Sequence, residues 1–321
     1  MGVIGLGVGE QHLIGFLNSP LVKSVSICDF DVKKIEKIKS KYPVKKIYKN
    51  SKSMIDDSEI DIISIASFDN NHFNQIERAL HNEKNVFCEK PICNSYNELK
   101  KIKNILSKKK HLKMTTNTLL RLSPRFQKLK KKIENSYFGS IYYMEFDYNY
   151  GRVHKLLDGW RGKIKNYSAT RGGGIHMIDL LLWLKKSYPK KITTYANNIC
   201  TRSMKNKIND FVVSLLKFAD GSVVKISSNF GCVYPHTHRI MIYGDIRTFE
   251  QSYSSSFFLT KKKDRTITKK NDTNEYPGIK KHVMISNFLE SINKNKKLII
   301  SHDEMFQTMK LCLDIEKSIK L

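Results

Sequence analysis

The chain of 321 residues carries a formal net charge of +27, because 57 Lys and Arg residues outnumber 30 Asp and Glu residues. Apolar residues form 40% and charged residues 27% of the sequence, which is ordinary for a globular protein long enough for two domains. The basic residues are mostly lysines spread along the whole chain. We therefore expect solvated helix faces that attract anionic ligands, and no specific nucleic-acid surface.

The sequence also argues against several other classes of protein. It shows no secretory signal and no apolar run of the length that a bilayer needs, so we expect no membrane segment. The six cysteines form no CxxC pair, which favours reduced thiols in a cytoplasmic protein. His236 and His238 have the spacing of a metal pair, but no third ligand is evident, so we expect no metal site.

The chain opens with a predicted strand over residues 1–4, a glycine turn and an apolar helix. Gly5 allows the tight turn, Gly7 lets the backbone approach a pyrophosphate, and the helix N-terminus supplies N–H donors. The third glycine of a GxGxxG motif would fall at Glu10, whereas Gly9 comes one residue early. The first strand is short for a central strand, so either it is truncated or the natural start lies upstream.

An acidic residue follows at the place where dinucleotide-binding proteins hold the adenosine ribose. Asp29 comes after a predicted strand over residues 25–28, and a carboxylate there disfavours a 2′-phosphate. The sequence therefore favours NAD, while Lys33 and Lys34 leave NADP open. The alternative is that Asp29 is only a turn residue, with Asp31 as the N-cap of the next helix.

Strands alternate with helices as far as residue 116, which predicts a parallel, doubly wound sheet. The carboxyl ends of such strands lie at one edge, where ligands bind. The residues that we expect to bind the cofactor at this edge are Gly5, Gly7, Gly9, Asp29, Ser67, Asn70, His72, Glu89, Lys90 and Asn117.

The stretch over residues 85–91 carries the strongest chemical signal in this half of the chain. An apolar strand stops at Glu89 and Lys90, and Pro91 prevents it from continuing. Lys90 at such a strand end suits a proton-transferring or electrostatic lysine in a cleft. The alternative is a surface Glu-Lys pair before a turn.

Four features in this order resemble the Gfo/Idh/MocA oxidoreductases: GLGVGEQH at residues 5–12, Asp29, NNH at residues 70–72 and EKP at residues 89–91. These are NAD(P)-dependent enzymes that act mainly on sugars, sugar derivatives and polyols. The resemblance implies a Rossmann domain that binds NAD, with Lys90 beside the nicotinamide and the substrate hydroxyl. It also implies a homodimer or homotetramer and suggests surface-polysaccharide biosynthesis as the setting.

The pattern changes after residue 120 to strands joined by turns, which predicts a second, α+β domain with a mostly antiparallel open sheet. We expect domains over residues 1–118 and 119–321, with two closing helices, over 279–294 and 302–320, able to pack back on the first domain. Residues 260–275 are polar and predict an exposed excursion. The expected strands cover residues 142–149, 193–197, 210–218, 222–229, 238–243 and 248–253.

The stretch RGGGIHMIDLLLWL over residues 171–184 places His176 in the first turn of an apolar helix. A histidine there can face a cleft for proton transfer, or it can be a helix-capping or core residue. The resemblance implies that His176 is catalytic. The family's commoner aspartate four residues earlier is Gly172 here, so His176 acts with Lys90 alone or another group stands in. The candidates for that group are Asp179 as an orienter, Tyr148 and Tyr150.

Arginines and aromatic residues gather between the first strand of this domain and the glycine stretch, a combination that suits a sugar or sugar-phosphate lid. The alternative is a loop that packs on its own aromatic rings. The residues that we expect to bind substrate are Lys90, Arg152, Trp160, Arg161 and His176.

The sequence therefore predicts an NAD-dependent oxidoreductase that transfers a hydride between nicotinamide and a hydroxyl or keto carbon of a sugar, sugar nucleotide or cyclitol. The alternative is a redox-silent Rossmann-type protein that binds NAD or a sugar as a sensor or scaffold. Gly172 and Glu10, which depart from the expected motifs, favour that alternative.

Overall fold

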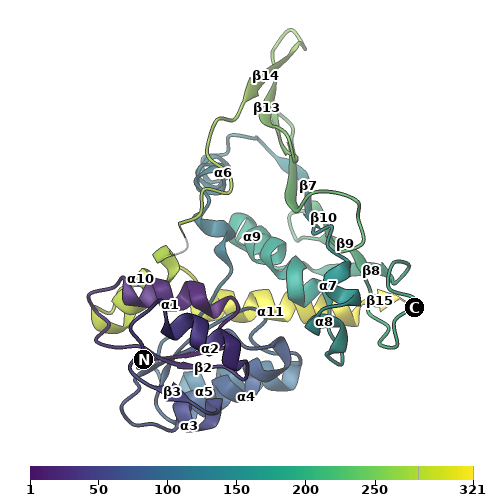
Figure 1. The fold of residues 1–321 in the computed structure, drawn as a ribbon. Coiled ribbons are helices and arrows are strands. Elements are labelled where there is room, and N and C mark those ends of the chain that lie inside the picture. Colours follow the sequence, from purple (N-terminus) through teal and green to yellow (C-terminus); the bar gives the residue numbers. More distant parts are fainter. Residues whose placement is uncertain (281, 321) are drawn as a thin grey trace. The chain divides into compact units, whose positions relative to one another are not determined.

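A computed structural model describes residues 1–280 and 282–320, and the chain divides into two compact units (Figure 1). The first unit comprises Met1–Asn117 and Lys280–Lys310, and the second comprises Thr118–Ile279 and Leu311–Leu321. Among the described residues, no helix combines the length and apolarity that a membrane crossing requires.

The first unit is built on a parallel sheet of six strands in the order β3-β2-β1-β4-β5-β6. The order reverses beside β1, which is the topological switch point at which open α/β sheets bind ligands. This arrangement confirms the predicted doubly wound sheet, and it adds a short strand, β3, that was not among the predicted elements. The strands are β1 (Gly2–Ile4), β2 (Ser26–Cys28), β3 (Ile47–Tyr48), β4 (Ile62–Ile65), β5 (Asn85–Cys88) and β6 (Met114–Thr116).

Helices cover this sheet, and one of them comes from the far end of the chain. Phe87 of β5 contacts Phe16 and Phe288 in edge and tilted ring arrangements, at 6.3 and 5.7 Å between ring centroids. A Cβ atom at Gly15 would lie 2.6 Å from Ile285, so this glycine permits the close approach of two helices. The helices are α1 (Gly9–Leu17), α2 (Val32–Lys39), α3 (Ser51–Ile55), α4 (His72–His81), α5 (Tyr96–Lys108) and α10 (His282–Asn293).

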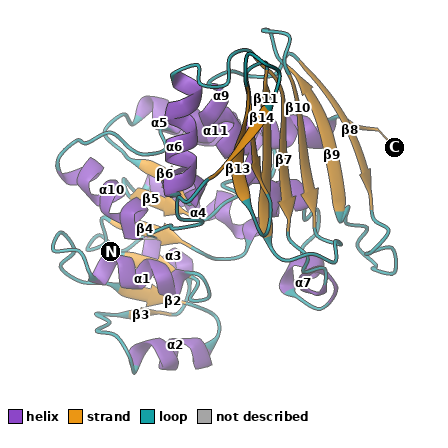
Figure 2. Ribbon diagram, turned by 90° about the horizontal axis from the view of Figure 1, so that it is seen from above, coloured by secondary structure: helices purple, strands orange, loops and turns teal. Residues whose placement is uncertain are grey.

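The second unit contains a sheet of nine strands in the order β14-β13-β12-β11-β7-β10-β9-β8-β15. Two pairs, β7 with β10 and β8 with β15, are parallel, and the other pairs are antiparallel. The predicted mostly antiparallel sheet is thus confirmed (Figure 2). Its strands are β7 (Ile141–Asn149), β8 (Lys191–Asn197), β9 (Phe211–Lys217), β10 (Val223–Asn229), β11 (Thr237–Gly244), β12 (Arg247–Gln251), β13 (Ser256–Lys261), β14 (Ile267–Asn271) and β15 (Ile319–Lys320).

The predicted exposed excursion over residues 260–275 is largely a regular hairpin. β13 and β14 pair from Phe257 with Asn271 to Lys261 with Ile267, and every residue of β14 is exposed. A strand at the edge of a sheet can be solvated on both faces, so its polar sequence lacks the alternation that marks a half-buried strand. Figure 1 shows this hairpin extending from the sheet.

The apolar helix α9 (Ile175–Lys185) lies against β7 of the second unit, and a π-helical turn, η3 (Thr170–Gly174), leads into it. Asp179 of α9 forms a buried bidentate pair with Arg121, with both N–O distances at 2.8 Å. The other helical segments that include residues of this unit are η2 (Leu119–Leu122), α6 (Pro124–Glu134), α7 (His154–Leu157), α8 (Trp160–Lys163) and α11 (His302–Lys317).

Candidate active site

The glycine turn between β1 and α1 has the geometry that a dinucleotide requires. Gly5 has φ +85°, and a Cβ atom on it would lie 2.7 Å from the carbonyl carbon of Ala66. A Cβ atom on Gly7 would meet nothing within 4 Å, so the backbone there is open to a ligand. α1 begins without a side-chain cap, which leaves its first N–H groups able to bind a pyrophosphate. The turn therefore fits the cofactor.

The two departures from the glycine motif have a structural explanation. A Cβ atom on Gly9 would lie 3.1 Å from Val3, so Gly9 allows α1 to pack closely on the sheet. Glu10 accepts a hydrogen bond of 3.4 Å from Tyr42 and pairs with Lys37 at 3.8 Å. The Glu10 carboxylate is thus engaged by residues of the α2 region, which reduces its repulsion of a phosphate.

Asp29 connects the end of β2 to the glycine turn. Its carboxylate oxygens accept hydrogen bonds from the N–H of Leu6 at 2.6 Å and of Asp31 at 2.9 Å. The Asp31 side chain in turn caps α2, as the alternative interpretation of this segment expected. Beside them the Phe30 ring is 77% exposed and contacts the Phe68 ring edge-on at 5.7 Å. No arginine lies next to Asp29 in the sequence to accommodate a 2′-phosphate.

Glu89, at the carboxyl end of β5, is held by a chain of polar contacts that the sequence did not reveal. Its Oε1 atom lies 3.2 Å from His12 Nε2 and accepts a hydrogen bond of 2.6 Å from Asn117. The other ring nitrogen of His12 lies 2.9 Å from the Ser64 hydroxyl. Burial raises the pKa of Glu89, but the contact with His12, the charge of Lys90 and the hydrogen bond from Asn117 together lower it by more. The resulting pKa is about 2. Glu89 is therefore a fixed anion next to Lys90.

The residues around Lys90 anchor its position. Lys90 is half-buried, and its peptide bond to Pro91 is cis. The buried His72 ring lies 2.7 Å from the Pro91 carbonyl oxygen and 3.0 Å from that of Ser67. His72 thus links the loop after β4 to the turn that follows Lys90.

The remaining candidates in this loop differ in exposure. The Ser67 hydroxyl donates a hydrogen bond of 2.7 Å to Gln75, whereas Asn70 is exposed. Together, the polar residues of the first unit lie at the carboxyl ends of β1, β2, β4, β5 and β6.

In the second unit, aromatic and hydroxyl groups surround the glycines of η3. A Cβ atom on Gly172 would lie 2.5 Å from Tyr167 Cζ, and one on Gly173 would lie 2.9 Å from Tyr148 Cδ1. A Cβ atom on Gly174 would lie 3.2 Å from that of Ser228. The phenol of Tyr167 therefore occupies the space that a side chain at position 172 would need. π-helical turns of this kind are frequent at functional sites.

His176 follows this turn directly and is half-buried. The Tyr148 ring stacks on it with centroids 6.2 Å apart, and the His238 ring lies edge-on to it at 6.5 Å. Asp179, a candidate orienter, has both carboxylate oxygens in hydrogen bonds to Arg121. Tyr148, one of the candidates to stand in for the missing aspartate, thus has a ring contact with His176, as does His238.

Two further histidines complete this cluster: His238 lies on β11, and His236 directly precedes that strand. His238 Nδ1 lies 2.5 Å from the Tyr276 hydroxyl, and the His236 ring lies 5.3 Å from Tyr148. Burial and the neighbouring His236 lower the pKa of His238 to about 3, so its imidazole is neutral at physiological pH. Among the described residues, no group of three or more His, Cys, Asp or Glu side chains is arranged to hold a metal ion. The sequence singled out His236 and His238 only as a metal pair and missed their contacts with Tyr148 and His176.

The arginines and aromatic residues expected to bind substrate follow β7. The Arg152 guanidinium lies 5.2 Å from the Tyr150 ring, and that of Arg161 lies 4.5 Å from the Trp160 ring. Tyr150 also packs on Phe230 at 4.8 Å. These side chains therefore belong to the same aromatic cluster as Tyr148.

The first domain is doubly wound and carries a glycine turn and an anchored acid–lysine pair at its strand ends, and the second domain has an open sheet. This combination is that of a dinucleotide-dependent oxidoreductase. Two family models match the chain: "Oxidoreductase family, NAD-binding Rossmann fold" at residues 1–117 and "GFO/IDH/MocA C-terminal domain" at residues 126–250. The chain belongs to the Gfo/Idh/MocA family and is an NAD-dependent dehydrogenase or reductase, as the sequence predicted.

Named relatives and solved structures agree with this assignment. The chain is 25% identical over 256 residues to a myo-inositol 2-dehydrogenase from Thermotoga maritima, covering 76% of this chain and 72% of that protein. A crystal structure of myo-inositol 2-dehydrogenase from Lactobacillus plantarum matches with a TM-score of 0.83 at 20% identity, covering 99% of this chain and 96% of that one. The UDP-N-acetylglucosamine 3-dehydrogenase from Acidithiobacillus ferrooxidans matches with a TM-score of 0.79 at 16% identity, with the same two coverages.

Proposed function

We propose that the protein transfers a hydride between NAD and a hydroxyl-bearing or keto carbon of a sugar, sugar nucleotide or cyclitol. The observation that carries this proposal is the fixed Glu89 anion and the adjacent Lys90 at the carboxyl edge of a sheet whose glycine turn fits a dinucleotide. The inositol and sugar-nucleotide dehydrogenases among the similar proteins support this substrate class.

Each candidate residue has a specific role in this proposal. The Gly5–Gly9 backbone and the N-terminus of α1 bind the pyrophosphate, and Asp29 binds the adenosine ribose. When NAD is bound, its nicotinamide supplies the hydride acceptor. Lys90 donates a hydrogen bond to the reacting oxygen and stabilises the negative charge that develops there.

His176 removes the hydroxyl proton in the oxidative direction and returns it in the reductive direction. A positioned acid–base group of this kind contributes roughly a hundred- to ten-thousandfold to the rate. Tyr148 keeps the imidazole in place through the ring contact described above. The neutral His238 does not add a positive charge that would oppose protonation of His176.

Replacement of Lys90 by Met tests this function. The variant retains the length and apolar stem of lysine but lacks the ammonium group, so we expect NAD binding to remain and turnover nearly to vanish. Binding is measured by calorimetry, and turnover by the near-ultraviolet absorbance of reduced nicotinamide with a panel of sugars, sugar nucleotides and cyclitols. Normal turnover by Lys90→Met would rule out this role of Lys90.

A redox-silent sensor or scaffold is the second candidate, and the observation that favours it is the absence of a carboxylate at Gly172. Such a protein would bind NAD or a sugar without any change in nicotinamide absorbance. The same substrate panel with wild-type protein separates the two functions.

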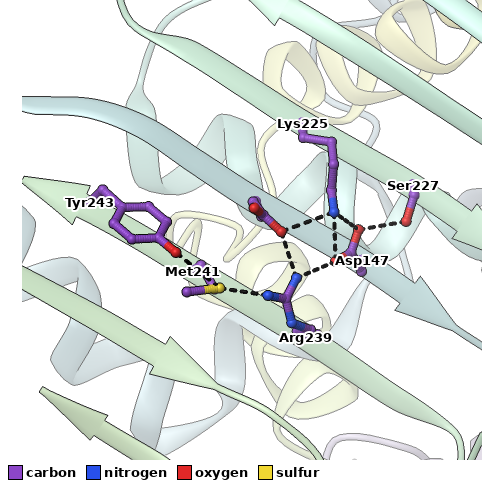
Figure 3. Close-up of polar contacts among 7 residues, drawn as sticks. Asp147, Lys225, Ser227, Arg239, Met241 and Tyr243 are labelled. Atoms are coloured by element: carbon purple, nitrogen blue, oxygen red, sulfur yellow. Dashed lines mark hydrogen bonds and ion pairs between the residues drawn. The ribbon is translucent and has the colours of Figure 1, made fainter.

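We further propose that the protein acts in the cytoplasm, in surface-polysaccharide biosynthesis, as a homodimer or homotetramer. One face of the second-unit sheet supports self-association: Tyr195 is 58% and Leu215 49% exposed on it. The same face carries a network of charges in which Lys225 and Arg239 reach Asp147 at 3.1 and 2.8 Å from neighbouring strands (Figure 3). Leu215→Glu should lower the mass measured by light scattering, whereas the exposed Ile199→Glu control should not.

A further inference from the structure

Three cations next to the histidine–tyrosine cluster of the second unit are held against aromatic rings. The Arg152 guanidinium and the Lys155 ammonium lie 5.2 and 6.0 Å from the Tyr150 ring centroid. The Arg161 guanidinium lies 4.5 Å from that of Trp160. Cation–π contacts of this kind orient a charge without neutralising it.

In the part of the chain that the structure describes, none of these three cations forms an ion pair with a carboxylate. Other arginines of the same unit, by contrast, form such pairs. Residues 151–167 contain a single acid, Asp158, which is exposed. The paired arginines are Arg121 with Asp179, Arg125 with Asp272, Arg171 with Glu316, and Arg239 with Glu145 and Asp147. The positive charge after β7 is thus locally uncompensated.

The field of these cations reaches the candidate catalytic cluster. Burial raises the pKa of Tyr148, and the charges of Arg161 and Arg152 oppose that rise. Burial lowers the pKa of His236 to about 4, and the charges of Arg152 and Lys155 lower it as well. Tyr150, against which Arg152 and Lys155 lie, stacks on Tyr148, and Tyr148 in turn stacks on His176.

We infer that Arg152, Lys155 and Arg161 form a subsite for a negatively charged group of the substrate, either a phosphate or diphosphate ester or a carboxylate. Guanidinium groups match the geometry of both anions, and the Tyr150 and Trp160 rings provide apolar faces for a sugar or a base. This inference rests on the proposed function and narrows it, because it makes an anionic sugar derivative the substrate and a neutral cyclitol a poor one.

The test compares the double variant Arg152→Gln/Arg161→Gln with wild type in the presence of NAD. The probes are UDP-N-acetylglucosamine, glucuronate and myo-inositol, and each is examined for binding by calorimetry and for turnover by nicotinamide absorbance. Loss of two charge-assisted contacts should weaken binding of the anionic substrate about ten- to a hundredfold. This loss of affinity should exceed any loss of affinity for myo-inositol by about tenfold. Comparison of UDP-N-acetylglucosamine with glucuronate shows whether the subsite binds a diphosphate or a carboxylate. The exposed Arg265→Gln is the matched control and should change none of these values.

The outcomes separate this inference from the proposed function. Anion binding that weakens in the double variant, without turnover of any probe by wild type, supports the subsite and contradicts the oxidoreductase function on these substrates. Turnover of myo-inositol by wild type with no binding of either anionic probe overturns the subsite and leaves the proposed function standing. Equal losses for all three probes in the double variant also overturn it.

Discussion

The phenol of Tyr167 lies against Gly172, with Cζ only 2.5 Å from the position that a Cβ atom at residue 172 would take. Tyr167 is buried, and its ring contacts Trp160 and Phe230 edge-on. The family's commoner aspartate at this position is therefore not simply deleted in this chain, because a tyrosine from an adjacent loop fills the space. A glycine at residue 172 and a tyrosine at residue 167 form a matched pair.

Gly172→Asp should destabilise the protein because the new side chain overlaps the Tyr167 ring. Overpacking of this kind costs typically about 1–3 kcal/mol in free energy of unfolding. Tyr167→Ala leaves a cavity, yet in combination the two changes should compensate in part, so the double variant should be more stable than the sum of the two singles predicts. Urea denaturation measures this coupling, and strict additivity would show that the two residues do not share the space.

Glu89 should make the protein sensitive to acid. Its folded pKa of about 2 lies below the unfolded value of about 4.3, so its contribution is fully present above the unfolded value. That contribution is lost progressively as the pH falls through the interval down to about 2. Glu89→Gln should therefore flatten the decline in free energy of unfolding between about pH 5 and pH 3. The exposed Glu36→Gln is the control and should keep the wild-type dependence of the free energy of unfolding on pH. The same wild-type dependence in Glu89→Gln would show that Glu89 is not the group responsible.

Asp29 should determine the preference for NAD. The Asp29→Asn variant keeps one acceptor oxygen for the Leu6 N–H but removes the charge that repels a 2′-phosphate. We expect the ratio of NADP to NAD affinity to rise by about tenfold, the effect of about 1.4 kcal/mol. Titration calorimetry with both dinucleotides measures the ratio. An unchanged ratio would mean that the Asp29 carboxylate does not face the ribose.

Local sequence patterns predicted much of the first unit because its candidate site residues lie in short motifs of neighbouring residues. Gly5 and Gly7 fall where a βα turn needs a positive φ and an open backbone, and Lys90 follows a strand that Pro91 ends. The strand–helix alternation then placed them at one sheet edge. The contacts of His12 with Ser64 and Glu89 were missed because they join residues that are far apart in the sequence.

The second unit was less accessible to the same reasoning. Its expected strands were correct in place and type, but the cluster around Tyr148 depends on long-range contacts with β11 that no local pattern reveals. The pairing of Asp179 with Arg121 and the filling of the Gly172 site by Tyr167 are likewise products of tertiary packing. The spacing of His236 and His238 drew attention to this segment, but only as a metal pair that lacked a third ligand.

The most direct test of the central claim is a double-mutant cycle on kcat with Lys90→Met, His176→Asn and the combined variant. Groups that act on one reacting hydroxyl work as a unit, so their effects on the rate are strongly non-additive. We predict that each single variant loses at least about a hundredfold in kcat and that the combined variant is about as slow as the slower single. Losses that multiply, or a single variant with the wild-type rate, would contradict a shared role of Lys90 and His176 in hydride transfer.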